Sequence, residues 1–360
     1  MKKKKTGILT YAYSPSFGAV LQCYALRLAA RRLAPENTTI EIIPFAPPTC
    51  ITSAPWYEIS RSRRLKRFAE FRRLFLDLPS EPFRSLLELE KNRHYDQIIV
   101  GSDQVWNPGI REDGLAYFLP DVFHDVQKDA YAASFGVDDP ILIKKNADKI
   151  SSYLAKFRHI SVREASGIPI CSMLGRDDVC EVIDPTFLPD PEDYQSLMSS
   201  TAHKKHPSMV CGFFLKEATF HEKLLLLLAE KTGAKARIIN SPSRFFSPIQ
   251  RQKYTTIPQF VENIQNARLV VTDSFHAVAF SIIFHRDFIV IPNIVFPERI
   301  TRITNLLKLA GLTDRIADNT ANDLAKAIAL SEQPIEYEQV HNYLEPVRNK
   351  SLKYLEKILR

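Results

Sequence analysis

The chain has 360 residues, of which 45% are hydrophobic and 25% charged, a balance typical of globular proteins and not of disordered or fibrous ones. Single cores stop growing at about 250 to 300 residues, so the length predicts two domains. The formal net charge of +7 suggests an anionic partner, whereas apolar stretches such as residues 277–284 are too short for a membrane span of roughly 18 residues.

The first residues of the chain and its cysteines indicate the cellular compartment. The basic residues 2–5 are followed by an apolar run of only residues 7–9, which is too short for an export signal. The five cysteines include no CxxC pair, and their odd number suits a reducing compartment better than a disulfide framework. We therefore expect a cytoplasmic protein that holds no metal and uses no cofactor.

The first half of the chain alternates short apolar runs with segments of helical spacing. Strands are expected at residues 6–11, 97–100, 130–134 and 159–162, and a helix at 19–33. Residues 188–191, Leu-Pro-Asp-Pro, read as a linker, because proline removes a backbone donor and favours extended backbone before it. We predict one α/β domain over residues 1–188.

The alternation restarts beyond the linker. Strands are expected at residues 209–215, 236–240, 268–272 and 288–291, and helices at 220–231, 258–266 and 275–284. We predict a second parallel α/β domain over residues 189–335, followed by a helix in 336–360 that crosses back to the first domain. Two such domains, with the carboxyl ends of their strands facing a cleft, would place ligands where loops meet helix N-termini.

Thr272-Asp273-Ser274-Phe275-His276 joins a buried strand directly to a helix and places His276 in the first helical turn. The exposed N–H groups of a helix start bind phosphate or carboxylate, and a histidine beside such an anion can transfer a proton. The alternative is that Asp273 or Ser274 merely caps the helix and that His276 packs in the core.

Two further strand ends carry polar groups. Arg163 and Glu164 follow the strand at 159–162, and Arg163 could bind a carboxylate or phosphate through two hydrogen bonds or form only a surface pair with Glu164. Residues 101–107 read Gly-Ser-Asp-Gln-Val-Trp-Asn and offer hydrogen-bonding groups beside an aromatic platform, equipment suited to a sugar. The alternative for this second segment is a turn with a core tryptophan.

Two further groups of basic residues are candidate anion-binding sites. Arg299 and Arg302 start a helix and could reach an anion held near His276. The run 61–73 has apolar residues at helical spacing and could form a basic helix that lies on anionic lipid or a simple solvated face. Its basic residues are Arg61, Arg63, Arg64, Lys66, Arg67, Arg72 and Arg73.

Taken together, these segments resemble the polysaccharide pyruvyl transferase family. The matching stretches, in the family's order, are residues 7–10 with 17–22, 95–107, 131–136, 161–167, 184–186 and 272–284. Ser16 and Phe17 replace the usual asparagine and tyrosine, Ala277 stands where many relatives carry glycine, and Asp287 where proline is common. These departures remove no titratable group that the family's chemistry needs.

The resemblance implies two Rossmann-like domains in a GT-B-like arrangement, with phosphoenolpyruvate as donor and a hydroxyl pair of a glycan as acceptor. The product would be a pyruvate ketal in capsule, exopolysaccharide or other cell-surface glycan synthesis, with a lipid-linked acceptor at the cytoplasmic membrane face. By resemblance, His276 is the acid or base, and Arg163, Ser274 and either Arg299 or Arg302 bind the donor. Tentative acceptor residues are Phe17, Gly18, Ser102, Asp103, Gln104, Trp106 and Asn107.

Two other functions compete with this one. A GT-B glycosyltransferase that uses a nucleotide sugar shares the architecture, but the series of motifs argues against it. A nonenzymatic basic module would bind nucleic acid or membrane through residues 61–73. No nucleic-acid fold motif or interleaved aromatic platform accompanies those charges, so we expect no nucleic-acid partner.

Overall fold

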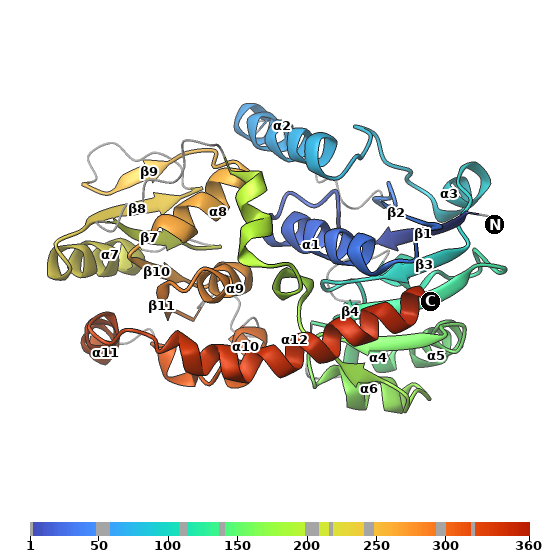
Figure 1. Ribbon diagram of the computed structural model, residues 1–360. Helices are drawn as coiled ribbons and strands as arrows, with labels where there is room; N and C mark the ends of the chain where they lie inside the picture. The colour runs from blue at the N-terminus through green and yellow to red at the C-terminus, as the bar shows by residue number, and fades with distance from the viewer. Residues whose placement is uncertain are drawn as a thin grey trace. The chain divides into compact units, whose positions relative to one another are not determined.

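The chain forms two compact units, each built on its own parallel sheet (Figure 1). Unit 1 comprises Met1–Pro189 and Val347–Arg360, and unit 2 comprises Asp190–Pro346. The computed structural model describes residues 3–47, 58–107, 114–136, 141–198, 209–215, 219–240, 248–292, 300–317 and 321–360. The chain therefore passes between the units after Pro189 and again after Pro346, inside its last helix.

Unit 1 contains a six-stranded sheet in the order β2-β1-β3-β4-β5-β6, and every neighbouring pair is parallel. The strands are β1 (Lys4–Leu9), β2 (Thr38–Ile42), β3 (Gln97–Val100), β4 (Gln127–Ala133), β5 (His159–Val162) and β6 (Cys180–Glu181). The helices are α1 (Phe17–Leu33), α2 (Glu58–Phe75), α3 (Leu86–Asn92), α4 (Ile141–Lys144), α5 (Ala147–Leu154) and α6 (Gly167–Met173). Parallel strands need crossover connections, which is why helices separate most of them.

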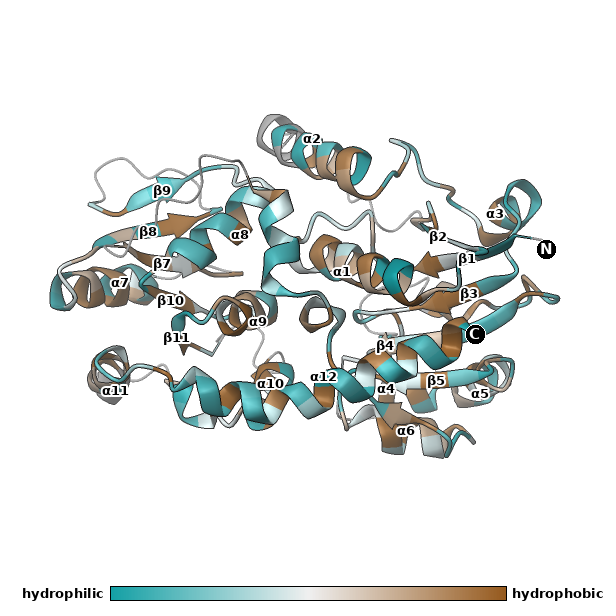
Figure 2. Ribbon diagram, in the orientation of Figure 1, coloured by the Kyte–Doolittle hydropathy of each residue, from teal (hydrophilic) through white to brown (hydrophobic). Residues whose placement is uncertain are grey.

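Unit 2 contains a five-stranded parallel sheet in the order β11-β10-β7-β8-β9. Its strands are β7 (Met209–Phe213), β8 (Lys235–Ile239), β9 (Gln250–Gln252), β10 (Leu269–Thr272) and β11 (Asp287–Val290). Its helices are α7 (Thr219–Lys231), α8 (Ile257–Asn266), α9 (Phe275–Ile283), α10 (Ile300–Ala310) and α11 (Ala321–Ser331). The central strands are apolar along their length, as strands covered on both faces must be (Figure 2).

The last helix, α12 (Tyr337–Leu359), ends against the sheet of unit 1. Gln97 Nε2 and Arg158 Nη2 each donate to the Ile358 carbonyl at 2.6 Å, and Lys4 Nζ donates to the Leu359 carbonyl at 3.2 Å. Carbonyls in the last turn of a helix have no intrahelical partner, and cations favour that end of the helix dipole. These side chains therefore anchor the end of the chain to β1, β3 and β5.

In each sheet the strand order reverses at one place, which marks where ligands bind in open α/β folds. The reversal lies between β1 and β3 in unit 1 and between β7 and β10 in unit 2. Residues 10–16 and 101–107 follow β1 and β3, and residues 273–276 follow β10. Most of the site residues expected from sequence therefore lie at these two switch points.

None of the described helices is long and apolar enough to cross a membrane. Within the same described ranges, no group of three or more His, Cys, Asp or Glu side chains is placed to hold a metal ion.

Candidate functional site

The switch point of unit 2 carries His276 in the first turn of α9. The turn before it is held by the end of β7 and the residues that follow it: Asp273 Oδ1 accepts from the Leu215 amide at 2.8 Å, and Thr272 Oγ1 donates to the Phe213 carbonyl at 2.5 Å. His276 itself is 9% exposed. Hydrogen bonds to the neighbouring strand β7 thus fix the direction in which α9 leaves the sheet.

Ser274, the N-cap residue of α9, has extended backbone and makes no side-chain cap hydrogen bond within the described residues. Asp273 accepts from the Leu215 amide, and His276 is buried, as the alternative of a packed histidine expected. The positive end of a helix dipole favours anions, so an anion beside His276 stays a prediction.

Of the two arginines expected near that anion, Arg302 lies within the described residues and Arg299 does not. Arg302 lies in the first turn of α10, and α10 packs against α9. Its side chain is half-buried.

Arg163, at the end of β5 in unit 1, lies among three carboxylates. Its Nε is 2.9 Å from Glu164 Oε1, and its Nη1 is 3.0 Å from Asp184 Oδ2 and 3.7 Å from Asp103 Oδ1. The Arg163 side chain is only 2% exposed. Burial by itself lowers the pKa of this guanidinium, but the carboxylates, Glu164 foremost, outweigh burial and raise it.

This cluster of Arg163, Asp103, Glu164 and Asp184 carries a net negative formal charge. An anionic donor approaching Arg163 would meet three carboxylates that already surround the guanidinium, so these neighbours oppose the expected donor contact. The surface pair considered as the alternative is also wrong, because the Arg163–Glu164 pair is buried. Arg163 instead ties together the ends of β3 and β5 and the turn at Asp184.

Asp184 was not among the site residues expected from sequence, although its Asp-Pro-Thr segment was recognised. Its Oδ1 accepts from both the amide and the hydroxyl of Thr186, at 3.0 and 2.8 Å, while Oδ2 faces Arg163. The sequence signal was an aspartate directly before a proline that begins a short helical turn, η4 (Pro185–Phe187), which favours this capping role.

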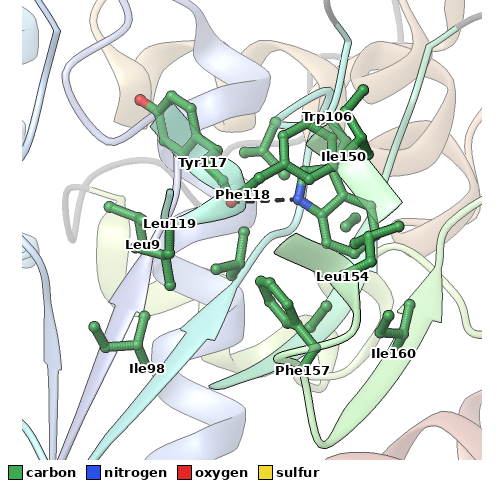
Figure 3. Close-up of a cluster of buried hydrophobic side chains, with 14 of the residues drawn as sticks. Leu9, Ile98, Trp106, Tyr117, Phe118, Leu119, Ile150, Leu154, Phe157 and Ile160 are labelled. Carbon is green, nitrogen blue, oxygen red and sulfur yellow. Dashed lines mark hydrogen bonds between the residues drawn. The ribbon is translucent and has the colours of Figure 1, made fainter. Parts of the chain in front are cut away.

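Trp106 is not the aromatic platform that the sequence suggested. Its ring is fully buried and stacked on Phe118, with ring centroids 5.3 Å apart, and Phe157 lies nearby (Figure 3). Phe135 also contacts the ring. Its indole Nε1 donates to the Tyr117 carbonyl at 3.3 Å. The alternative prediction, a turn with a core tryptophan, is therefore confirmed, because no face of the ring is open to a sugar.

The other tentative acceptor residues divide by exposure. Ser102 is fully buried and donates to the Ala132 carbonyl at 2.9 Å. Phe17, Gly18 and Asn107 are also buried. Asp103 and Gln104 alone in this set keep partly exposed side chains, and Asp103 is the most exposed carboxylate around Arg163.

Asp103 is held in place at the switch point of unit 1. Its backbone has a φ of 79°, and its carbonyl accepts from the Ser134 amide at 3.0 Å. A non-glycine residue in this left-handed region is strained and persists only where its surroundings impose it. The turn after β3 thus fixes the Asp103 carboxylate, which is 15% exposed, near Arg163 at the carboxyl end of the sheet.

The basic helix α2 packs part of its apolar face, although Leu65 and Leu74 on the same helix are exposed. Phe68 and Phe71 are buried, with their rings 5.4 Å from Phe17 and 6.4 Å from Tyr24 respectively. Arg72 is also buried, its guanidinium 4.9 Å from the centre of the Tyr13 ring, so the expectation that it faces a membrane is wrong.

The remaining basic residues of α2 present charge. Arg63, Lys66 and Arg73 are exposed and Arg67 is half-buried, whereas the side chains of Arg61 and Arg64 lie outside the described part of the chain. The exposed side chains of this helix are therefore both basic and apolar, because Leu65 and Leu74 are exposed as well.

The described cysteines do not offer a nucleophile. Burial raises the pKa of the Cys23, Cys171 and Cys211 thiols to about 12, so these thiols stay protonated at neutral pH. Burial also raises the pKa of Cys180.

A family model for polysaccharide pyruvyl transferases matches residues 17–294 of this chain. No curated protein matches it. Among solved structures, a putative UDP-N-acetylglucosamine 2-epimerase from Listeria monocytogenes is similar at 10% identity, covering 99% of this chain and 91% of its own, with a TM-score of 0.54.

Two further structures give the same result. A UDP-GlcNAc 2-epimerase from Neisseria meningitidis bound to UDP-GlcNAc has 11% identity, 99% coverage of both chains and a TM-score of 0.55. A UGT from Arabidopsis thaliana complexed with UDP-L-rhamnose has 11% identity, covers 98% of this chain and 95% of its own, and has a TM-score of 0.52. At such identities the likeness shows the fold, which is that of the GT-B class, as predicted from sequence.

Proposed function

Because the chain belongs to the polysaccharide pyruvyl transferase family, we propose that it transfers the enolpyruvyl group of phosphoenolpyruvate to a hydroxyl pair of a glycan. The product is a cyclic pyruvate ketal, and phosphate is released. The observation that carries this proposal is the family match over residues 17–294, which includes His276 at the helix start following β10.

The donor is assigned to the switch point of unit 2. Phosphoenolpyruvate carries a phosphate and a carboxylate, and the positive dipole end of α9, where Ser274 makes no side-chain cap bond, favours one of them. Arg302, and Arg299 beyond the described residues, would neutralise the remaining charge. We assign no metal or cofactor to this chemistry.

His276 moves the proton. Protonation of the donor's methylene carbon makes C2 electrophilic, and a glycan hydroxyl adds to C2 with loss of its proton. Phosphate then leaves, and the neighbouring hydroxyl adds to C2 with loss of its own proton, which closes the ketal. His276 serves as the acid or the base in these steps. The acceptor is assigned to unit 1, where Asp103 and Gln104 can accept or donate hydrogen bonds to its hydroxyls.

Arg163 takes a different role from the one that family resemblance implies. We assign it to positioning, because its guanidinium already binds Glu164 and Asp184 and lies 3.7 Å from Asp103. It holds the Asp103 carboxylate at the carboxyl end of the sheet while the donor is bound elsewhere.

The direct test measures ligand stabilisation and phosphate release together. Phosphoenolpyruvate is expected to raise Tm, and phosphate is expected to appear only when a glycan acceptor from a lipid-linked panel is also present. The competing nucleotide-sugar function has the support of the solved structures with bound UDP-sugars. Stabilisation by UDP and not by phosphoenolpyruvate would replace the proposal with that function.

The exposed charge of α2 predicts salt-sensitive binding to anionic vesicles, consistent with a lipid-linked acceptor. Lys66→Gln with Arg73→Gln is expected to weaken flotation about 30-fold, because each basic residue near an anionic surface contributes about 1 kcal/mol. Binding should vanish near 1 M salt, where the Debye length is about 3 Å. The matched control neutralises two exposed lysines on α12, Lys350 and Lys353. Equal loss in both double variants, or flotation with zwitterionic vesicles, would refute a specific role for α2.

A further inference from the structure

Unit 2 contains a polar cavity of about 520 Å³ that the proposed reaction does not use. It lies along α8, β8 and β9 and is lined chiefly by the amide side chains of Gln250, Gln252, Gln259, Asn263 and Asn266. Arg237 and Glu262 also line it.

The cavity is separate from the start of α9. Met209, the first residue of β7, lines it, and so does Asn266, the last residue of α8 before β10 begins. Since the strands are parallel, these two residues mark the amino ends of β7 and β10, whereas His276 follows the carboxyl end of β10. The cavity extends from there along β8, β9 and α8, and none of residues 273–276 lines it.

Its side chains are already organised by one another. Arg237 Nη1 donates to Asn263 Oδ1 at 3.0 Å, and Arg237 Nη2 donates to Gln250 Oε1 at 3.0 Å. Asn263 Nδ2 in turn donates to Gln252 Oε1 at 2.9 Å. A connected network of this kind fixes rotamers, so ligand binding would cost little side-chain entropy.

The chemistry of the lining favours a neutral ligand rich in hydroxyls. Amides present donors and acceptors together, as sugar hydroxyls require. Charge is balanced, because Arg251 Nη2 pairs with Glu222 Oε1 at 2.7 Å and Glu262 shares the cavity with Arg237. The amide side chains that make up most of the lining are suited to binding.

We propose that this cavity is a second carbohydrate subsite, which binds neutral sugars of the acceptor glycan away from the hydroxyls that react. The proposal rests on the proposed function for its ligand class, because that function supplies a polysaccharide acceptor. Its volume falls within the range of small-molecule sites, about 300 to 1,000 Å³. Holding part of a polymer here would raise the local concentration of the remainder without taking part in the chemistry.

The test places a large side chain from α8 in the cavity. Glu262 is half-buried and lines the cavity, whereas Gln265, also half-buried on the same helix, does not line it. Glu262→Trp is expected to weaken binding of neutral microbial oligosaccharides on a glycan array about tenfold, or about 1.4 kcal/mol. The matched variant Gln265→Trp should bind as the unmodified full chain does, and circular dichroism and Tm show whether both variants fold.

Parallel thermal shifts with phosphoenolpyruvate separate the two proposals. The subsite is supported if the unmodified chain binds glycan and Glu262→Trp abolishes that binding, whatever phosphoenolpyruvate does. A failure of phosphoenolpyruvate to stabilise the chain would argue only against phosphoenolpyruvate as the donor. The subsite is wrong if phosphoenolpyruvate binds but the array shows no neutral glycan. It is also wrong if both tryptophan variants bind glycan equally, or if inorganic phosphate displaces the glycan. Should Glu262→Trp fail to fold, Glu262→Ala with Gln265→Ala repeats the comparison by calorimetry.

Discussion

Arg163→Met is expected to lower the free energy of unfolding by about 3–5 kcal/mol, because it leaves buried carboxylates without their cation. Urea denaturation of the full chain measures this loss. Arg163 contacts Glu164 and Asp184 at 2.9 and 3.0 Å, and both carboxylates are almost fully buried. Replacing a residue that holds such a cluster together should therefore lower the free energy of unfolding.

A second variant keeps this prediction testable if Arg163→Met does not fold. Asp184→Asn combined with Arg163→Met removes one of the orphaned charges, so the double variant should recover part of the stability relative to the sum of the single effects. Arg302→Met is the comparison variant, because we propose that Arg302 binds the donor. It should raise the KM for phosphoenolpyruvate and leave the free energy of unfolding almost unchanged. Wild-type stability in Arg163→Met together with lost phosphoenolpyruvate binding would restore Arg163 to the donor site.

His276→Gln is expected to lower kcat for phosphate release about 10²- to 10⁴-fold, the usual contribution of a positioned acid or base. Glutamine keeps polar groups in the first turn of α9 but cannot relay a proton. Donor binding, measured as the phosphoenolpyruvate-dependent rise in Tm, should persist because the helix amides remain.

His285 provides the matched control in the same unit. It is exposed, follows α9 and stacks on Tyr337 with ring centroids 4.7 Å apart. Its φ of 53° suits asparagine, so His285→Asn should fold and turn over normally. Near wild-type turnover in His276→Gln, or equal loss in both variants, would contradict the role given to His276.

Elements with strong apolar patterns were predictable. β3 and β5 begin and end where the sequence placed them, and the last helix, α12, lies within the predicted range 336–360. β2, β6 and β9 were missed. All three lie at sheet edges; β6 has only two residues, and β9 reads Gln-Arg-Gln, so backbone hydrogen bonds pair these two strands without an apolar pattern.

The sequence by itself determined the family, the fold class and the place of His276 at the start of a helix, because these depend on local order along the chain. Only the tertiary structure decided what surrounds Arg163, Trp106 and Arg72. Parallel strands bring their carboxyl ends together whatever their separation in sequence, so Asp103 and Asp184 meet Arg163 from opposite sides along the chain. A residue's partners and burial arise from that convergence, and this is why an arginine expected to bind a donor is a buried anchor and a tryptophan expected to hold a sugar is core.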